Sequence, residues 1–244
     1  MTLLSILLAS ASALLVGLSK TGLPGVSILG IVLMTEAYPQ DARFSVAAIL
    51  PLLLAGDVFA VAWFRRHADW GRLARLLPWV LVGMAPGVFV LREFEGNRLR
   101  PIIGGLVLGM LAIELCRQRF GWQRMPHRWW FAAATGLLAG FTTFVANAAM
   151  PVMSIYLVSQ DFDKRRFIGT AAWFFLILNV SKVPPYCAMG MLTWKMLPTA
   201  SALAPLVILG ALVGVYVLVR IPQRFFDALA LLLAGLAAIR LVAI

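Results

Sequence analysis

Lys20 lies in the stretch Ser19-Lys20-Thr21-Gly22-Leu23-Pro24-Gly25, between two uncharged apolar runs, residues 2–18 and 26–35. A lysine inside hydrocarbon costs roughly 2.5–3.5 kcal/mol on insertion scales, which makes it a candidate functional residue. The glycines and Pro24 break the helix where the charge lies. The stretch predicts an anion site at a broken membrane segment, with the candidate ligands Ser19, Lys20, Thr21, Gly22 and Gly25. The alternative is a kinked, packed helix whose hydroxyls bond to their own backbone.

A second lysine follows in the stretch Asn179-Val180-Ser181-Lys182-Val183-Pro184-Pro185. Asn179 and Lys182 are three residues apart and share one helix face, and the two prolines are expected to disturb the helix directly afterwards. The functional interpretation is a second cation for the same anion, with Asn179 and Ser181 as hydrogen-bond donors. The alternative is a lysine near the membrane interface whose side chain snorkels to the surface.

Asp57 is the only acidic residue well inside an apolar segment. It could pair with Lys20 or Lys182, or it could be a protonatable coupling site. The sequence leaves these two interpretations open.

The elements that must position these residues are eight apolar segments of spanning length. The first and fifth are too long for one crossing and carry breakers near their middles, which predicts re-entrant hairpins whose tips meet near the midplane. The fifth adds Thr142, Thr143 and Asn147 as candidate ligands. The segments cover residues 3–35, 43–64, 73–91, 99–116, 129–158, 166–190, 196–219 and 225–243.

The two long segments belong to an internal repeat, because a constant offset of 123 aligns the two halves of the chain. We therefore expect a first transmembrane repeat at 1–116, a cytoplasmic basic linker at 117–128 and a second transmembrane repeat at 129–244. The aligned pairs include Gly17 with Gly140, Arg43 with Arg166, Phe44 with Phe167, Arg72 with Lys195, and Gly87 with Gly210.

The charges of the loops bear on the topology. Two re-entrant hairpins place 13 loop Lys and Arg on one side and 6 on the other, whereas eight simple crossings give no bias. If only the fifth segment is re-entrant, the loops again carry 13 Lys and Arg on one side and 6 on the other. With both hairpins the halves have opposite orientations, so the expected fold is a pair of inverted four-segment repeats with both termini outside.

Composition sets the class. The 244 residues are 62% hydrophobic, with mean hydropathy +0.92, which predicts an all-α polytopic membrane protein. The net charge of +11 is scattered in short loop clusters, a pattern of topogenic loops rather than of a nucleic-acid-binding surface. We expect no metal site and no cofactor. The first apolar run lacks a basic leader, so we expect no cleaved signal peptide and no soluble domain beside the membrane part.

The motifs Gly17-Leu18-Ser19-Lys20-Thr21-Gly22-Leu23-Pro24-Gly25 and Asn179-Val180-Ser181-Lys182-Val183-Pro184, with the opening Gly136–Gly140 of the second half, resemble the TauE/SafE family of sulfite exporters. That family is also called the toluene sulfonate uptake permease family. The resemblance covers essentially the whole chain. One departure is the second break, which has no glycine between Phe141 and Pro151.

The resemblance implies secondary transport of sulfite, organosulfonates such as sulfoacetate, or related sulfur-containing anions. The expected protein is an exporter in a bacterial inner membrane that works by alternating access, with proton coupling left open. A passive anion channel is an alternative, since the two tips could form a filter. An intramembrane enzyme is disfavoured, because the segments lack a nucleophile–base pair, an aspartate dyad and an H-E-x-x-H motif.

Overall fold

The computed structural model describes residues 3–21, 26–39, 41–94, 98–120, 129–158 and 164–217, together with Leu232 and Ile239. Within these ranges the regular structure is entirely helical, which confirms the predicted all-α class. In chain order the helices are α1 (Leu3–Thr21), α2 (Val26–Ala37), α3 (Ala42–Phe64), η1 (Arg65–His67), α4 (Trp70–Glu93), α5 (Leu99–Phe120), α6 (Trp129–Ala146), α7 (Met150–Val158), α8 (Lys164–Ala188), η3 (Trp194–Met196) and α9 (Leu197–Val217).

Six of the described helices are long and apolar enough to cross a membrane, judged by length and composition. They are α1, α3 with η1, α4, α6, α8 and α9, and the shorter apolar helices are α2 and the first part of α5. This agrees with a multi-pass membrane protein. The last predicted segment, 225–243, lies outside the described residues apart from Leu232 and Ile239, and α5 extends to Phe120, into the predicted linker 117–128.

The first long segment is two helices that pack against each other, α1 and α2. Ser12 in α1 donates a hydrogen bond to the Gly30 carbonyl in α2, at 2.7 Å. The backbones are close here, and a Cβ on Gly30 would lie at an ordinary contact distance, 3.4 Å, from the Ser12 carbonyl oxygen. The predicted break falls where α1 ends, and its glycines lie outside the described residues.

The second long segment is also two helices, and its break is described. α6 ends at Ala146 and α7 begins at Met150. Asn147 has φ +54°, a left-handed conformation that asparagine tolerates better than most residues. Pro151 fits in the first turn of α7, where its missing N–H costs nothing. The predicted breaker is therefore confirmed, with the reversal at Asn147 itself.

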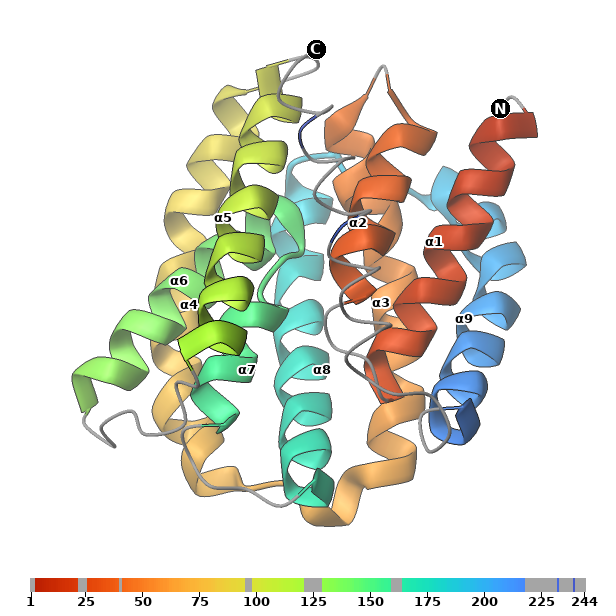
Figure 1. The fold of residues 1–244 in the computed structure, drawn as a ribbon. Coiled ribbons are helices and arrows are strands. Elements are labelled where there is room, and N and C mark those ends of the chain that lie inside the picture. The colour runs from red at the N-terminus through yellow and green to blue at the C-terminus, as the bar shows by residue number, and fades with distance from the viewer. Residues whose placement is uncertain are drawn as a thin grey trace.

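The two hairpins enter the bundle from opposite ends. Figure 1 shows α1 running downward from the N-terminus and α2 returning to the same upper end, whereas α6 rises from the lower end and α7 returns to it. Each hairpin has one long and one short arm, 19 and 12 residues in the first and 18 and 9 in the second.

α3 and α8 contact each other in the middle of the bundle and carry Asp57 and Lys182, the two fully buried charged residues of the candidate site. The expectation that Pro184 and Pro185 disturb α8 directly after Lys182 is wrong in one respect, because the helix continues through both prolines to Ala188. The helix therefore holds Lys182 in regular structure within the bundle.

Two pairs of crossing helices, α1 with α9 and α4 with α6, approach each other closely at glycines. In the α1–α9 crossing, a Cβ on Gly17 would lie 1.9 Å from the Val207 carbonyl oxygen, and one on Gly210 would lie 2.1 Å from that of Leu14. In the α4–α6 crossing, a Cβ on Gly140 would lie 2.0 Å from the Val80 carbonyl oxygen, and one on Gly83 would lie 2.3 Å from that of Leu137. Small residues of this kind let helices pack closely in membranes.

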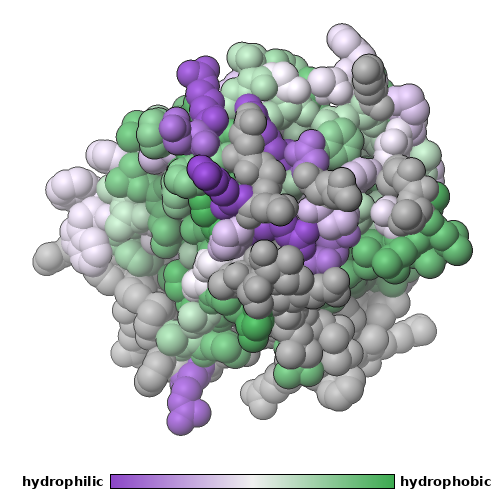
Figure 2. Space-filling view, turned by 90° about the horizontal axis from the view of Figure 1, so that it is seen from above, coloured by the Kyte–Doolittle hydropathy of each residue, from purple (hydrophilic) through white to green (hydrophobic). Residues whose placement is uncertain are grey.

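The outer surface suits a bilayer. Large apolar side chains stand exposed on several helices, and the exposed tryptophans at helix ends, Trp63, Trp70, Trp129 and Trp194, match an interfacial aromatic belt. Seen from above, hydrophilic residues gather toward the middle of the upper face, with hydrophobic residues around them (Figure 2).

Candidate functional site

Lys20 and Asp57 form a buried ion pair between α1 and α3. Lys20 Nζ lies 2.6 Å from Asp57 Oδ1, and the two side chains are 5% and 0% exposed. Gly56 leaves room for the lysine stem, since a Cβ there would lie 3.0 Å from Lys20 Cγ. The ammonium also lies 4.6 Å from the centre of the Phe175 ring, a cation–π geometry. Of the two interpretations of Asp57, the structure therefore contains the ion pair with Lys20.

The second oxygen of the same carboxylate is bonded to α8. Asn179 Nδ2 donates to Asp57 Oδ2 at 2.6 Å. Both carboxylate oxygens thus face a donor, one an ammonium and the other an amide. A buried carboxylate needs such partners, because an ionised group loses its hydration shell on burial.

Lys182, one helical turn beyond Asn179, is fully buried and donates to the second hairpin. Its Nζ lies 2.5 Å from Asn147 Oδ1 and 3.3 Å from Thr143 Oγ1. Complete burial rules out a side chain that snorkels to the surface. Within the described part of the chain, no carboxylate lies within ion-pair distance of Lys182, so its two partners are neutral oxygens.

Asn147 joins the hairpin break to the central helices. Its side-chain oxygen accepts from Lys182, and its Nδ2 donates to the Val46 carbonyl of α3 at 3.1 Å. Its backbone N–H closes the end of α6 by donating to Thr143 O at 2.9 Å. One residue therefore supplies the reversal of the chain and a ligand of the lysine.

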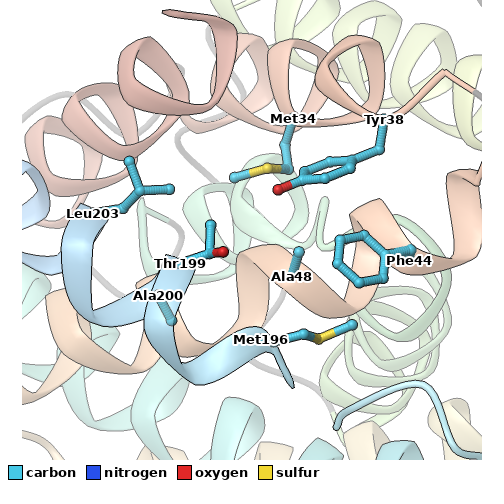
Figure 3. Close-up of a pocket in the computed structure, with 8 residues that line it drawn as sticks. All are labelled: Met34, Tyr38, Phe44, Ala48, Met196, Thr199, Ala200 and Leu203. Carbon is cyan, nitrogen blue, oxygen red and sulfur yellow. The ribbon is translucent and has the colours of Figure 1, made fainter. Parts of the chain in front are cut away.

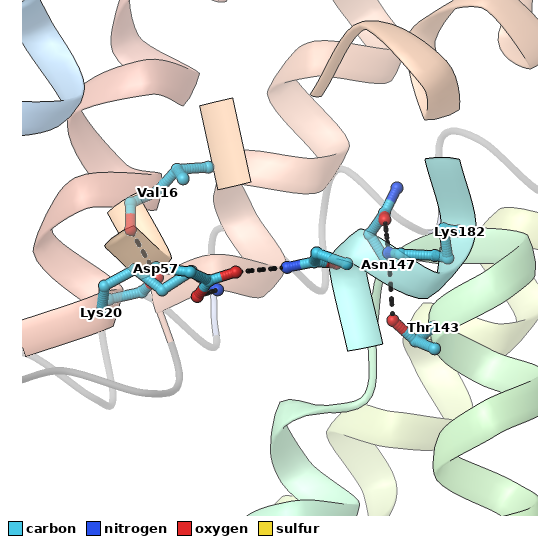
Figure 4. A network of polar contacts seen from close by, with 8 residues as sticks. Val16, Lys20, Asp57, Thr143, Asn147 and Lys182 are labelled. Atoms are coloured by element: carbon cyan, nitrogen blue, oxygen red, sulfur yellow. Dashed lines mark hydrogen bonds and ion pairs between the residues drawn. The ribbon is translucent and has the colours of Figure 1, made fainter. Parts of the chain in front are cut away.

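The polar contacts form two neighbouring groups that α8 brings together (Figure 4). One group is Lys20, Asp57 and Asn179, and the other is Lys182, Thr143 and Asn147. The end of α1 and the break after α6 thus both contact the middle of the bundle, as the sequence predicts for two hairpin tips. The groups are buried, so this conformation is closed around them.

Four other predicted ligands have hydroxyls that donate to backbone carbonyls. Ser19, Thr142 and Ser181 bond within their own helices, to Val16, Leu138 and Ile177. Thr21 donates to the Ala211 carbonyl of α9 at 2.7 Å. In this conformation these hydroxyls follow the alternative interpretation and stay outside the network. The predicted ligands Gly22 and Gly25 lie outside the described residues.

Two aromatic residues of the site were not predicted. Phe175 contacts Lys20, and the fully buried Tyr186 donates to the Phe144 carbonyl at 2.6 Å. That carbonyl lies in the last turn of α6, where helices leave backbone acceptors unpaired. Phe175 is four residues before Asn179 and Tyr186 four after Lys182, so the shared helix face was a usable signal.

Both ends of the central helices carry an arginine contact. At the upper end, Arg43 at the start of α3 donates to the Met189 carbonyl just after α8, at 3.3 Å. At the lower end, Arg166 near the start of α8 pairs with Asp69 after α3, at 2.6 Å. Burial pushes the pKa of Asp69 up, but the hydrogen bond from the Arg72 amide and the Arg166 guanidinium outweigh it and hold the pKa below its usual value.

A separate pocket opens between α2, the start of α3 and α9 (Figure 3). Its walls are apolar apart from Tyr38 and Thr199, and no residue of the polar network lines it. It is lined by Met34, Tyr38, Phe44, Ala48, Met196, Thr199, Ala200 and Leu203.

The fold and the site together define a polytopic helical membrane protein with two buried lysines beside two hairpin breaks. The chain belongs to the sulfite exporter TauE/SafE family, whose model matches residues 3–241. It is therefore a membrane transporter of a family that exports sulfite and related sulfur anions, and not a member of an enzyme family. No curated protein and no solved structure matches the chain. Within the described ranges, no group of three or more His, Cys, Asp or Glu could hold a metal ion.

Proposed function

We propose that this protein is a secondary transporter in a bacterial inner membrane that exports sulfite, organosulfonates such as sulfoacetate, or related sulfur anions. The observation that carries the proposal is the buried pair of lysines beside two hairpin breaks. Lysines inside a bundle mark ion and substrate pathways, because they are costly elsewhere in a membrane.

The charge of the network favours an anion. With both lysines protonated, two ammonium groups face one carboxylate, which leaves one positive charge in excess in a buried site. Thr143, Asn147 and Asn179 add side chains that can bond to sulfonate or sulfite oxygens. The proposed ligands are Lys20, Lys182 and these three residues, with the Gly22 and Gly25 amides at the first break.

Alternating access fits an inverted repeat, and the paired glycine crossings support that repeat. The contact of Gly17 with Val207 corresponds to the contact of Gly140 with Val80. The residue numbers differ by 123 between α1 and α6, and by 127 between their partners α4 and α9. Gly83 and Gly210 contact Leu137 and Leu14 with the same two offsets. These contacts favour an alignment of the two halves whose offset increases from 123 to 127 before α4 and α9. Gly210 then corresponds to Gly83, and not to Gly87 as in the alignment by a constant offset.

The direct test is transport by the purified protein in liposomes. Counterflow with sulfite, sulfoacetate, thiosulfate and sulfate is expected to select one or more of these anions. A passive channel would dissipate an anion gradient without ever accumulating the labelled anion by exchange. Absence of exchange with all four anions would reject the proposed substrate class.

Lysine variants test the site. Lys182→Met removes the charge and keeps an unbranched side chain, and we expect loss of anion binding with the protein still folded. Arg92→Met is the matched control, because Arg92 is an exposed basic residue at the end of α4. Equal anion affinity in Lys182→Met and Arg92→Met would place the binding site elsewhere.

A further inference from the structure

The Asp57 carboxylate occupies the position on Lys20 that a transported anion would need. It lies 2.6 Å from Lys20 Nζ and accepts from Asn179 Nδ2 at 2.6 Å, so one ammonium and one amide already hold one anionic group. A carboxylate and a sulfonate offer similar oxygen acceptors to such donors. In the closed conformation, Asp57 therefore acts as an internal substitute for substrate.

Resting on the proposed function, we propose that Asp57 is the proton-binding site of an anion–proton symporter, and that its protonation frees Lys20 for the substrate anion. The charge arrangement gives the reason. An anion that replaced Asp57 on Lys20 would sit beside a buried carboxylate, and two like charges in a buried site repel strongly. A proton on Asp57 removes that repulsion.

The charged groups near Asp57 fit this role. Among the described residues, the charged side chains that interact electrostatically with Asp57 are Lys20 from α1 and Lys182 from α8. α9, packed on the same part of α3, contributes the apolar Val207 beside Gly56. The other ion pairs that the described residues form around α3 lie at helix ends, Arg100–Glu36 and Arg166–Asp69. No second described carboxylate is thus available in the network to take the proton.

The cycle balances one proton against one anion. Water on the open side gives a proton to the Asp57 carboxylate, Lys20 remains an ammonium, and the anion binds to Lys20. After the site opens to the other side, the anion leaves, Asp57 gives its proton to water there, and the Lys20–Asp57 pair forms again. Anion and proton move in the same direction, so export of the doubly charged sulfoacetate with one proton carries one net negative charge outward, and a membrane potential that is negative inside drives it.

The experiment uses the full chain in liposomes that contain a pH-sensitive dye, with the membrane potential clamped by potassium and valinomycin. An inward gradient of sulfoacetate should acidify the interior as the anion enters. Asp57→Asn should keep anion–anion counterflow, which needs no proton release and reports a folded protein, but should lose the acidification. Asp41→Asn, a carboxylate change at the exposed N-cap of α3, is the control that should behave like wild type.

A second measurement compares wild type with Asp57→Asn, because Lys182 would also weaken anion binding if it lost its proton as pH rises. Sulfoacetate keeps its charge between about pH 6 and pH 8, and its affinity for wild type should fall by up to about tenfold per pH unit as pH rises, more steeply than its affinity for Asp57→Asn. Anion entry without acidification, acidification that persists in Asp57→Asn, or an affinity independent of pH would overturn the symport proposal and leave the proposed function standing. Failure of all four anions in counterflow would instead reject the proposed function, and the symport proposal with it.

Discussion

Arg43 and Arg166 make corresponding contacts at opposite ends of the two central helices. Each stands near the start of one helix and donates to the connection that follows the other, Arg43 to the Met189 carbonyl and Arg166 to Asp69. The two arginines are also 123 residues apart, the offset of the repeat that the sequence predicts. These two contacts join different groups, because Arg43 donates to a backbone carbonyl and Arg166 pairs with the Asp69 carboxylate.

This difference predicts that the lower end opens more readily when Asp69 loses its charge. Asp69→Asn keeps an oxygen to cap α4 through the Arg72 amide but removes the ion pair with Arg166. The pair is partly exposed, and such pairs contribute up to about 1 kcal/mol, so we expect a roughly two- to fivefold rise in access to the site.

Access is measured as the rate at which a maleimide modifies Thr143→Cys in a background without Cys116 and Cys187. Asp41→Asn is the matched control, since Asp41 also caps a helix through its side chain, that of α3. Equal modification rates in the two variants would mean that the Asp69–Arg166 pair does not hold this end closed.

The same pair should depend on pH. The pKa of Asp69 is lower in the folded protein than in the unfolded chain. Its stabilisation is therefore complete above the unfolded value, about 3.9, and is lost as pH falls through the lower folded value. Wild type should melt at a higher temperature than Asp69→Asn at neutral pH, and the difference should vanish in acid. A difference that stays constant down to acid pH would assign the effect to something other than this carboxylate.

The sequence was sufficient to predict the helical class, the two breaks and the charged residues that are buried, because each depends on a large free-energy cost that is visible in the local sequence. Glycine, proline and asparagine together favour a helix end, although Pro184 and Pro185 alone do not end α8, and a lysine inside hydrocarbon is expensive. It was not sufficient for the hydrogen-bond partner of each hydroxyl, because a helical Ser or Thr always has a carbonyl of the preceding turn within reach. Thr143 accepts from Lys182 while its neighbour Thr142 bonds to Leu138, and this choice depends on how α6 is rotated against α8.

The sequence was also not sufficient to align the two halves of the chain throughout their length. The sequence predicts a single offset of 123, whereas under the proposed repeat the glycine crossings pair Gly83 with Gly210. The extra residues lie between α8 and α9, where loops change length at little energetic cost. Only the contacts show which glycine faces which carbonyl.

The Lys20–Asp57 pair predicts unequal effects of single and double substitutions. Lys20→Met leaves the Asp57 carboxylate buried beside one amide, and breaking a buried pair in this way costs about 3–5 kcal/mol. Adding Asp57→Asn removes the second charge and keeps an acceptor for Asn179, so the double variant should recover most of the loss. Chemical unfolding of the purified variants measures this, and a double variant as unstable as Lys20→Met would contradict an energetically coupled pair.

The glycine crossings predict which small substitutions the bundle tolerates. Gly17→Ala and Gly140→Ala place a Cβ about 2 Å from a backbone oxygen, at Val207 and Val80, so the helices must move apart. Overpacking of this kind costs typically about 1–3 kcal/mol. Gly105→Ala is the control, because nothing lies within 4 Å of its Cβ position and alanine favours the helix. Thermal unfolding should rank Gly105→Ala at or above wild type, and equal losses at all three positions would contradict close crossings.

The hydrogen bond from Tyr186 to the Phe144 carbonyl predicts a local role in holding the second break. Tyr186→Phe keeps the ring that packs edge-on against Phe144, with centroids 5.1 Å apart, and removes only the donor. A buried acceptor left unpaired costs about 1–3 kcal/mol, and here the cost falls on the last turn of α6. Hydrogen exchange should therefore speed up at the amides of residues 144–148 more than in α4 or α9. Tyr216→Phe, at an exposed tyrosine in α9, is the control. Uniform acceleration throughout the bundle would mean that Tyr186 supports overall stability instead of the shape of the break.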